Sequence, residues 1–164
     1  MLLEGSCHCG AVRFSLQSHT PYPFMRCYCS ICRKTAGGGG YTVNIMGEAA
    51  TMKVEGADNL TVYRARLEAK AEGTEGEPSP ARRHFCRLCG SALWVSDPRW
   101  PELVHPFASA IDTALPRPTQ RVHVLVDSAA PWVELPEGEA ETRFAEYPDE
   151  SIEDWHRARG LTVA

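Results

Sequence analysis

The seven cysteines of this 164-residue chain form three short clusters, and no cysteine lies outside them. In chain order the clusters are Cys7 and Cys9, then Cys27, Cys29 and Cys32, then Cys86 and Cys89. A metal site closed by four ligands is filled by the two outer pairs. The central cluster is then left with three thiols and one ligand position that no cysteine fills. This division into four and three constrains both the fold and the chemistry.

The composition is that of a soluble globular chain, with 43% hydrophobic and 23% charged residues. We expect one domain over residues 1–164, because that length suffices to bury a core. The net charge is -4 and no basic stripe stands out, which argues against a nucleic-acid partner. No apolar run reaches the roughly 18 residues of a membrane span, so no membrane partner is expected. The oligomeric state stays open.

The beginning of the chain, MLLEGSCHCG, has neither the positive region nor the apolar region of a signal peptide. A cytoplasmic location is therefore predicted, and thiols stay reduced there. The odd number of cysteines also argues against a complete disulfide framework. Both points favour metal binding by the clusters.

Short alternating or β-branched segments separated by glycine and polar residues predict a mainly β fold with antiparallel pairing. The predicted strands cover residues 11–16, 24–27, 41–45, 50–54, 60–64, 103–107 and 122–126, and residues 84–95 predict a cysteine knuckle that runs into a further strand. The charged segment 66–83 holds two prolines and predicts an exposed loop. Gly37–Gly40 predicts a connector, because four glycines end any helix. Trp94, Trp132 and Trp155 are expected to pack in the core or between subdomains.

Two short helices are predicted. One turn over residues 30–35 would start with Ser30 as its N-cap, and it would place Cys29 and Cys32 on the same side. The second lies in the C-terminal tail, about residues 140–164, where Ser151 can cap a helix that Gly160 ends.

The outer pairs, Cys7 with Cys9 and Cys86 with Cys89, are each followed by a glycine and then by a strand. Zinc prefers four thiolate or imidazole ligands in structural sites. A shared zinc would clip the N-terminal strand to a strand late in the chain and stabilise a domain of short strands.

The central cluster offers only three thiolates, which leaves one zinc position for water, a substrate thiol or a carbonyl oxygen. With zinc its net charge would be about -1, which suits polarising a small carbonyl or holding a thiolate better than generating hydroxide. Alternatively a histidine closes the site and makes it structural. The candidates are His8, His19, His84, His105 and His123.

Tyr28, inside the cluster, can pack or can donate its hydroxyl to an oxyanion, and packing is the better interpretation.

Four motifs together resemble one known family. They are Gly5–Phe14 (GSCHCGAVRF), Cys27–Lys34 (CYCSICRK), His84–Ser91 (HFCRLCGS) and Pro131–Pro136 (PWVELP). In this combination and order the chain resembles the glutathione-dependent formaldehyde-activating enzymes, also called the GFA or centromere-protein-V family. Many relatives have histidine where this chain has Tyr28.

The resemblance implies a β-tent, small twisted antiparallel sheets built around two zinc sites, with a short C-terminal helix. It implies a structural zinc on the outer cysteines and a catalytic zinc on the central ones, that is, on Cys7, Cys9, Cys86 and Cys89, and on Cys27, Cys29 and Cys32. The implied reaction adds glutathione, or a related small thiol, to formaldehyde and is classed as a carbon–sulfur lyase reaction in reverse. Arg33 and Lys34 are candidates for binding glutathione carboxylates.

Two other functions stay open at this stage. A non-catalytic, zinc-stabilised binding module would have both metal sites closed. A thiol redox enzyme would need one cysteine outside a metal cluster, and this interpretation ranks lowest because the clusters absorb all seven.

Overall fold

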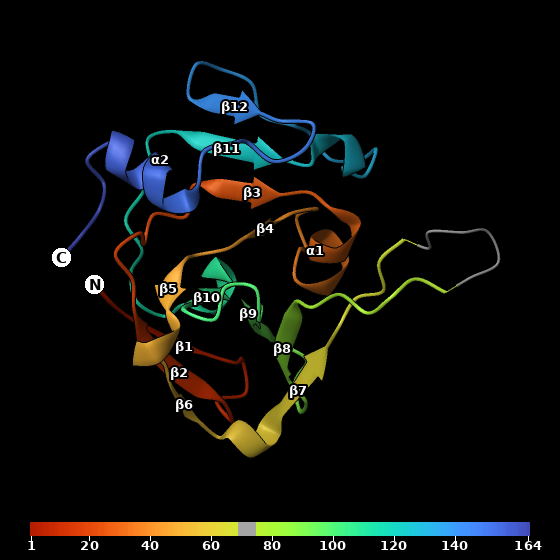
Figure 1. The fold of residues 1–164 in the computed structure, drawn as a ribbon, viewed down its shortest axis with the longest axis vertical. Helices are drawn as coiled ribbons and strands as arrows, with labels where there is room; N and C mark the ends of the chain where they lie inside the picture. The colour runs from red at the N-terminus through yellow and green to blue at the C-terminus, as the bar shows by residue number, and fades with distance from the viewer. Residues whose placement is uncertain (69–74) are drawn as a thin grey trace.

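A hairpin carries the first cysteine pair in its turn. The computed structural model describes residues 1–68 and 75–164, and strand β1 (Leu2–Ser6) pairs there with β2 (Arg13–Gln17). β2 also pairs with β6 (Lys53–Glu55), which completes a three-stranded antiparallel sheet in the order β1-β2-β6 (Figure 1). Strand β1 was not predicted, because its adjacent leucines do not alternate with polar residues.

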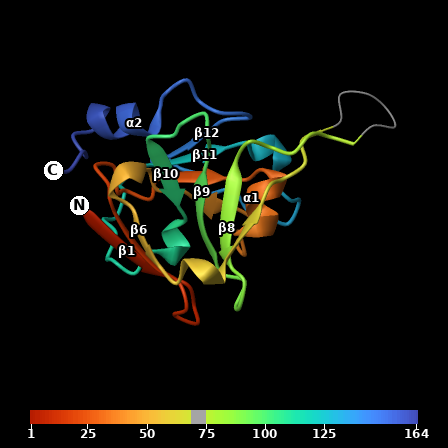
Figure 2. The ribbon, with the colours of Figure 1, turned by 60° about the horizontal axis from the view of Figure 1, so that its bottom comes forward.

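The second sheet has five antiparallel strands in the order β5-β10-β9-β8-β7. Their bounds are Gly47–Glu48, Leu103–Pro106, Ala92–Ser96, Arg82–Cys86 and Leu60–Tyr63. Figure 2 shows β10, β9 and β8 side by side. The pairing of β8 with β9 shifts register between His84 and Phe85. Strand β5, like β1, lies outside the predicted strands.

The third sheet has four strands in the order β12-β11-β3-β4. Their bounds are Glu141–Arg143, Arg121–Val124, Met25–Cys27 and Thr42–Val43. Here β11 runs parallel to both of its neighbours, whereas β3 and β4 are antiparallel. The prediction of a mainly β fold with small antiparallel sheets is confirmed, and this third sheet adds parallel pairs to it.

Both predicted helices are present, α1 at Ser30–Thr35 and α2 at Ile152–Ala158. The Ser151 hydroxyl caps α2 by accepting the Asp154 N–H at 3.1 Å, as predicted. The predicted cap of α1 is wrong. Its N-cap is Cys29, whose sulfur accepts the Cys32 N–H at 3.3 Å, so that Ser30 is already inside the helix. The described residues also contain four short 3-10 turns, at Ala49–Thr51, Ala57–Asn59, Ala108–Ala110 and Val126–Ser128.

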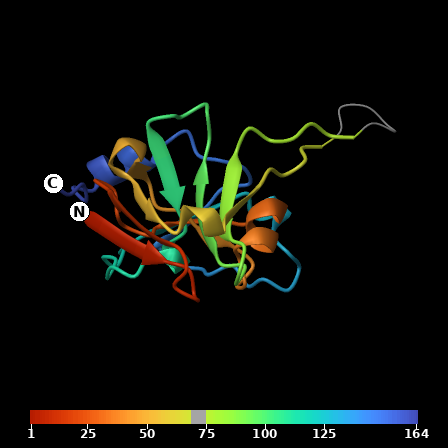
Figure 3. The ribbon, with the colours of Figure 1, turned by 90° about the horizontal axis from the view of Figure 1, so that it is seen from below.

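Two hydrophobic cores hold the sheets together, and each contains part of one cysteine cluster. The first core packs Phe14 and Leu16 against Trp94 and includes Cys7 and Cys86. It lies where the three-stranded sheet meets the five-stranded sheet, which Figure 3 shows from below. The hydrophobic effect drives this packing, because each large apolar side chain gains about 1.5–3 kcal/mol on full burial.

The second core lies between the four-stranded sheet and α2. Phe24 stacks on Trp155 with ring centroids 3.7 Å apart, and Cys27 and Cys32 belong to the same core. Trp94 and Trp155 are buried as expected, but Trp132 is 67% exposed, so it does not take the core position that was one of its two expected places. Its ring lies beside Gly40 instead.

The charged segment 66–83 ends differently from the prediction. Arg82 and Arg83 belong to β8, and Arg83 is buried. Arg66 forms a bridge with Pro78 and thereby pairs the two arms of the segment, and residues 69–74 lie outside the described residues. Among the described helices none has both the length and the apolar character required to cross a membrane.

Candidate metal centre

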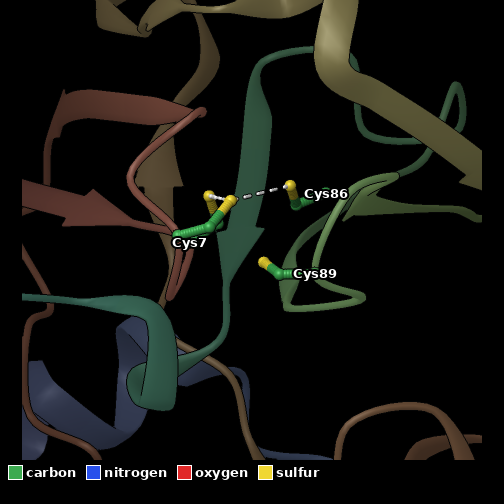
Figure 4. Close-up of side chains that lie close together, drawn as sticks. Cys7, Cys86 and Cys89 are labelled. Carbon is green, nitrogen blue, oxygen red and sulfur yellow. Dashed lines mark hydrogen bonds between the residues drawn. The ribbon is translucent and has the colours of Figure 1, made fainter.

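The four outer cysteines converge at the junction of the first two sheets. Their sulfurs all lie within 4.8 Å of one another. Cys7 Sγ is 3.5 Å from Cys9 Sγ, which is 3.8 Å from Cys86 Sγ. Figure 4 shows Cys7, from the first hairpin, facing Cys86 at the end of β8 and Cys89 in the loop after it. Tetrahedral thiolates around one zinc have sulfurs about 3.8 Å apart, since Zn–S is about 2.3 Å. We call these four residues the outer cluster.

The two halves of the outer cluster are turns of the same kind. Gly10 and Gly90 each have a positive φ, +74° and +73°, which glycine adopts without strain. In each turn the glycine N–H bonds back to the carbonyl of the first cysteine, Cys7 or Cys86, at 2.9 and 2.8 Å. The Val12 N–H points at Cys7 Sγ at 3.3 Å. The predicted glycine-terminated knuckles thus hold their sulfurs toward a common point.

Exposure differs within the outer cluster. Cys7 and Cys86 are buried, whereas Cys9 and Cys89 are exposed. A hydrogen bond with the Ser91 hydroxyl, 3.2 Å away, is the largest of the effects that lower the pKa of Cys89 to about 5. A thiol that ionises easily is prepared for metal binding, because the thiolate is the ligand.

The central cluster joins the end of β3 to the start of α1. The sulfurs of Cys27, Cys29 and Cys32 lie within 4.8 Å of one another, and Cys27 and Cys32 are buried. The first turn of α1 places Cys29 and Cys32 on one side, as predicted. The two cysteine clusters could therefore each hold a metal ion.

The three central thiols do not ionise alike. Hydrogen bonds with the thiols of Cys27 and Cys29 lower the pKa of Cys32, and the nearby Arg83 adds to this effect. Hydrogen bonds with Cys29 and Cys32, together with burial, raise the pKa of Cys27. The surroundings therefore favour a negative charge on Cys32 over one on Cys27.

No histidine closes the central cluster in residues 1–68 and 75–164. The groups of metal-binding side chains found there contain only Cys27, Cys29 and Cys32 at this place. Three of the five candidates are engaged elsewhere. His19 contacts Glu48 at 2.6 Å, His84 lies 3.1 Å from Ser96 Oγ, and His123 contacts Tyr28 and Glu141. His8 is exposed, and His105 lies in β10.

Tyr28 is fully buried, and its hydroxyl forms a hydrogen bond with another buried side chain. The hydroxyl lies 2.8 Å from His123 Nδ1, and His123 Nε2 lies 2.7 Å from Glu141 Oε2. Burial lowers the pKa of His123, so the ring is neutral. The carboxylate can only accept, which places the proton on Nε2 and makes Nδ1 the acceptor for the Tyr28 hydroxyl. This hydroxyl is therefore not available to an oxyanion.

Arg33 and Lys34, the two candidates for binding glutathione carboxylates, lie on α1 directly after Cys32. Arg33 is partly buried, with an Nε that bonds to nothing in the described part of the chain, and Lys34 is exposed. Neither takes part in an ion pair among the described residues.

Three further residues beside the central cluster were missed from the sequence. Arg83 Nη2 lies 4.0 Å from Cys32 Sγ, and Thr42 pairs with Cys27 across β4 and β3. Tyr147 has an exposed ring, but burial of its hydroxyl and the neighbouring thiols, Cys27 first among them, raise its pKa. Arg83 follows a charged run and reads as surface, and Tyr147 is more than 100 residues from the thiols, so no local signal marks them.

Comparison with known proteins agrees with this architecture. The family described as glutathione-dependent formaldehyde-activating enzyme matches residues 2–127. A curated protein of Halomonas elongata, named "Putative glutathione-dependent formaldehyde-activating enzyme", is 60% identical over 161 residues, which is 98% of each chain. A crystal structure of a Rhodobacter sphaeroides protein aligns with a TM-score of 0.51 at 26% identity, covering 69% of this chain and 91% of that one. This chain belongs to the glutathione-dependent formaldehyde-activating enzyme family.

Proposed function

We propose that the chain is a zinc-dependent carbon–sulfur lyase that joins a small thiol to formaldehyde and also splits the adduct. Glutathione is the expected thiol, which the family and the name of the Halomonas elongata relative support. The observation that carries the proposal is the central cluster: three converging thiols, with no fourth protein ligand in the described part of the chain.

Two zinc ions would occupy the two clusters, the outer one structural and the central one catalytic. Thiolates are ligands that zinc prefers, and three of them leave a position for substrate. At that position zinc would supply a Lewis acid for an aldehyde oxygen. The alternative, a binding module with both sites closed, needs a fourth ligand that the described residues do not offer.

The residues of the chain hold and orient the reactants. The first turn of α1 fixes Cys29, whose sulfur accepts the Cys32 N–H, so the helix itself positions this sulfur. Arg33 and Lys34, on the next positions of α1, are placed to bind the carboxylates of glutathione. Because thiols add readily to formaldehyde in water, most of the gain comes from proximity of the two reactants.

Replacing one central cysteine tests the proposal. Cys32→Ala should lower the zinc content from two ions to one per chain and abolish the acceleration of S-hydroxymethylglutathione formation, followed by exchange NMR. Ser30→Ala, an exposed neighbour, is the matched control and should leave both unchanged. Unchanged turnover in folded Cys32→Ala would refute catalysis at the central cluster.

A further inference from the structure

The buried guanidinium of Arg83 stands out among the charged groups of the protein. Only 7% of Arg83 is exposed, although it stands at the end of the charged segment 66–83. Strand β8 lies between β7 and β9 in its sheet, and Arg83 is the cross-strand partner of Tyr63 in β7 and of Val95 in β9. Figures 2 and 3 both show α1 beside β8, and the side chain reaches Cys32 with Nη2 4.0 Å from its sulfur.

Most hydrogen-bonding capacity of Arg83 is unused. Its Nε and Nη1 are buried and bond to no other group in residues 1–68 and 75–164, and no carboxylate there pairs with it. A buried charge without hydrogen-bond partners is costly, so natural proteins keep such groups mainly where a ligand satisfies them.

A second unpaired polar group lies at the same place. Thr42 is 4% exposed, and its Oγ1 also bonds to no group in the described part of the chain. Thr42 is the cross-strand neighbour of Cys27, whereas Arg83 touches Cys32. Two buried donors thus flank the three thiols from two different sheets.

The charge of the site determines what these donors can bind. Three thiolates and one zinc would carry a net charge of about -1, which repels an anionic reactant. The guanidinium, with its positive charge, would bring the local charge to about zero. Its free N–H groups form strong, charge-assisted hydrogen bonds with an anionic oxygen.

We propose that Arg83, assisted by the Thr42 hydroxyl, is the oxyanion-binding residue of the central site. The assignment rests on the proposed function: as the thiolate sulfur bonds to the aldehyde carbon, the C=O π bond breaks and its electron pair moves to oxygen. Arg83 donates to that oxygen as its charge develops. The oxygen then takes a proton from water, which balances the proton that the thiol lost.

Binding of formate, a small oxyanion, tests the assignment without turnover. Cobalt(II) is placed in the metal sites, and the thiolate absorption bands are followed during titration with formate. Arg83→Gln should weaken formate binding roughly tenfold or more, as expected for the loss of a charge-assisted hydrogen bond. Thr42→Val should weaken it less. Arg82→Gln, the exposed neighbour on β8, is the matched control and should bind like the wild type.

Turnover of the zinc-loaded protein separates this assignment from the proposed function. Arg83→Gln should also lose at least tenfold in kcat/KM while keeping two zinc ions. A wild type that binds formate through Arg83 but turns over no adduct would refute the lyase function and keep the oxyanion site. Arg83→Gln that binds formate within twofold of wild type would overturn the assignment. If Arg83→Gln does not fold, formate binding is measured in Arg83→Met and Arg83→Lys instead. Arg83→Lys should then bind formate more tightly than Arg83→Met.

Discussion

At the scale of single residues, Tyr28 shows how a side chain inside a metal-binding motif can bond to residues far away in the sequence. Tyr28 lies between two cluster cysteines, yet its hydroxyl donates to His123, which is held by Glu141, which in turn pairs with Arg121 at 2.7 Å. The ring also packs against Tyr41, with centroids 5.3 Å apart. These contacts connect the residue that follows β3 with β11 and β12.

Tyr28→Phe should therefore destabilise the protein without emptying the central cluster. The phenylalanine ring fills the same space but leaves the buried Nδ1 of His123 without its donor. Such a loss costs about 1–3 kcal/mol. Chemical denaturation should show the decrease, and zinc analysis should still find two ions per chain.

Tyr41→Phe provides the comparison, because no hydrogen bond of the Tyr41 hydroxyl is found among the described residues, and its stability should change little. A different result for Tyr28→Phe, with unchanged stability and a large fall in turnover, would mean that the hydroxyl serves the substrate rather than His123.

At the scale of elements, two of the four consecutive glycines are required by packing. A Cβ on Gly37 would lie 2.6 Å from the Tyr41 carbonyl oxygen and 2.8 Å from Arg33 Cα. Gly40 has a φ of +87°, and its Cβ would lie 2.3 Å from Val133. Gly38 and Gly39 meet no such obstacle. The predicted connector is thus also a close contact between the end of α1 and the segment around Trp132.

Helix α2 is held on the four-stranded sheet by a histidine that must be neutral. His156 is fully buried and lies 2.8 Å from the Ile152 carbonyl through Nδ1, which can only donate there. Its Nε2 accepts the Tyr22 N–H at 3.2 Å. Protonation would place a second N–H against that of Tyr22, and burial lowers the pKa of His156 below 6.5.

Acid should therefore loosen this contact. Below pH 6.5 the unfolded chain takes up a proton at His156 that the folded chain does not. The stability supplied by the neutral ring is complete above that pH and is lost as pH falls toward the folded pKa, by up to about 1.4 kcal/mol per pH unit. Unfolding free energies measured between pH 7 and pH 5 should fall more steeply for wild type than for His156→Gln, which does not titrate.

Comparing the two proteins at each pH removes the contribution of metal ligands, because both carry the same cysteines. Parallel pH profiles for wild type and His156→Gln would contradict the neutral, acceptor role of Nε2.

At the scale of the whole molecule, local patterns predict the parts of this structure that form locally. The cysteine spacings predict both clusters, period-two alternation predicts β2, and Ser151 predicts the start of α2. The features that the sequence does not reveal depend on contacts between residues that are far apart in the chain. Arg83 reads as one more charge at the end of a charged segment, whereas in the fold it is buried beside Cys32 of α1. Tyr28 and His123 are 95 residues apart, so no local signal announces their bond.

The two clusters also differ in how much of the chain they tie together. With a metal bound, the outer cluster would join residues 7 and 86 and close a loop of about 80 residues between two sheets, whereas the central cluster would close only six residues. Loop-closure entropy grows as (3/2)RT ln n, so a clip across the longer loop removes roughly 2 kcal/mol more from the unfolded chain. The outer zinc should therefore contribute to stability far more than the central one.

Matched variants that leave two thiols in either site test this difference. Cys9→Ser combined with Cys89→Ser removes the two exposed outer ligands, and Cys29→Ser removes one central ligand. Each should lower the zinc content to about one ion per chain. The outer double variant should lose roughly 2 kcal/mol more in unfolding free energy, because only it reopens the long loop between the sheets. Equal losses, or a larger loss in Cys29→Ser, would show that local packing around the thiols, rather than chain closure, sets the stabilising effect of each zinc.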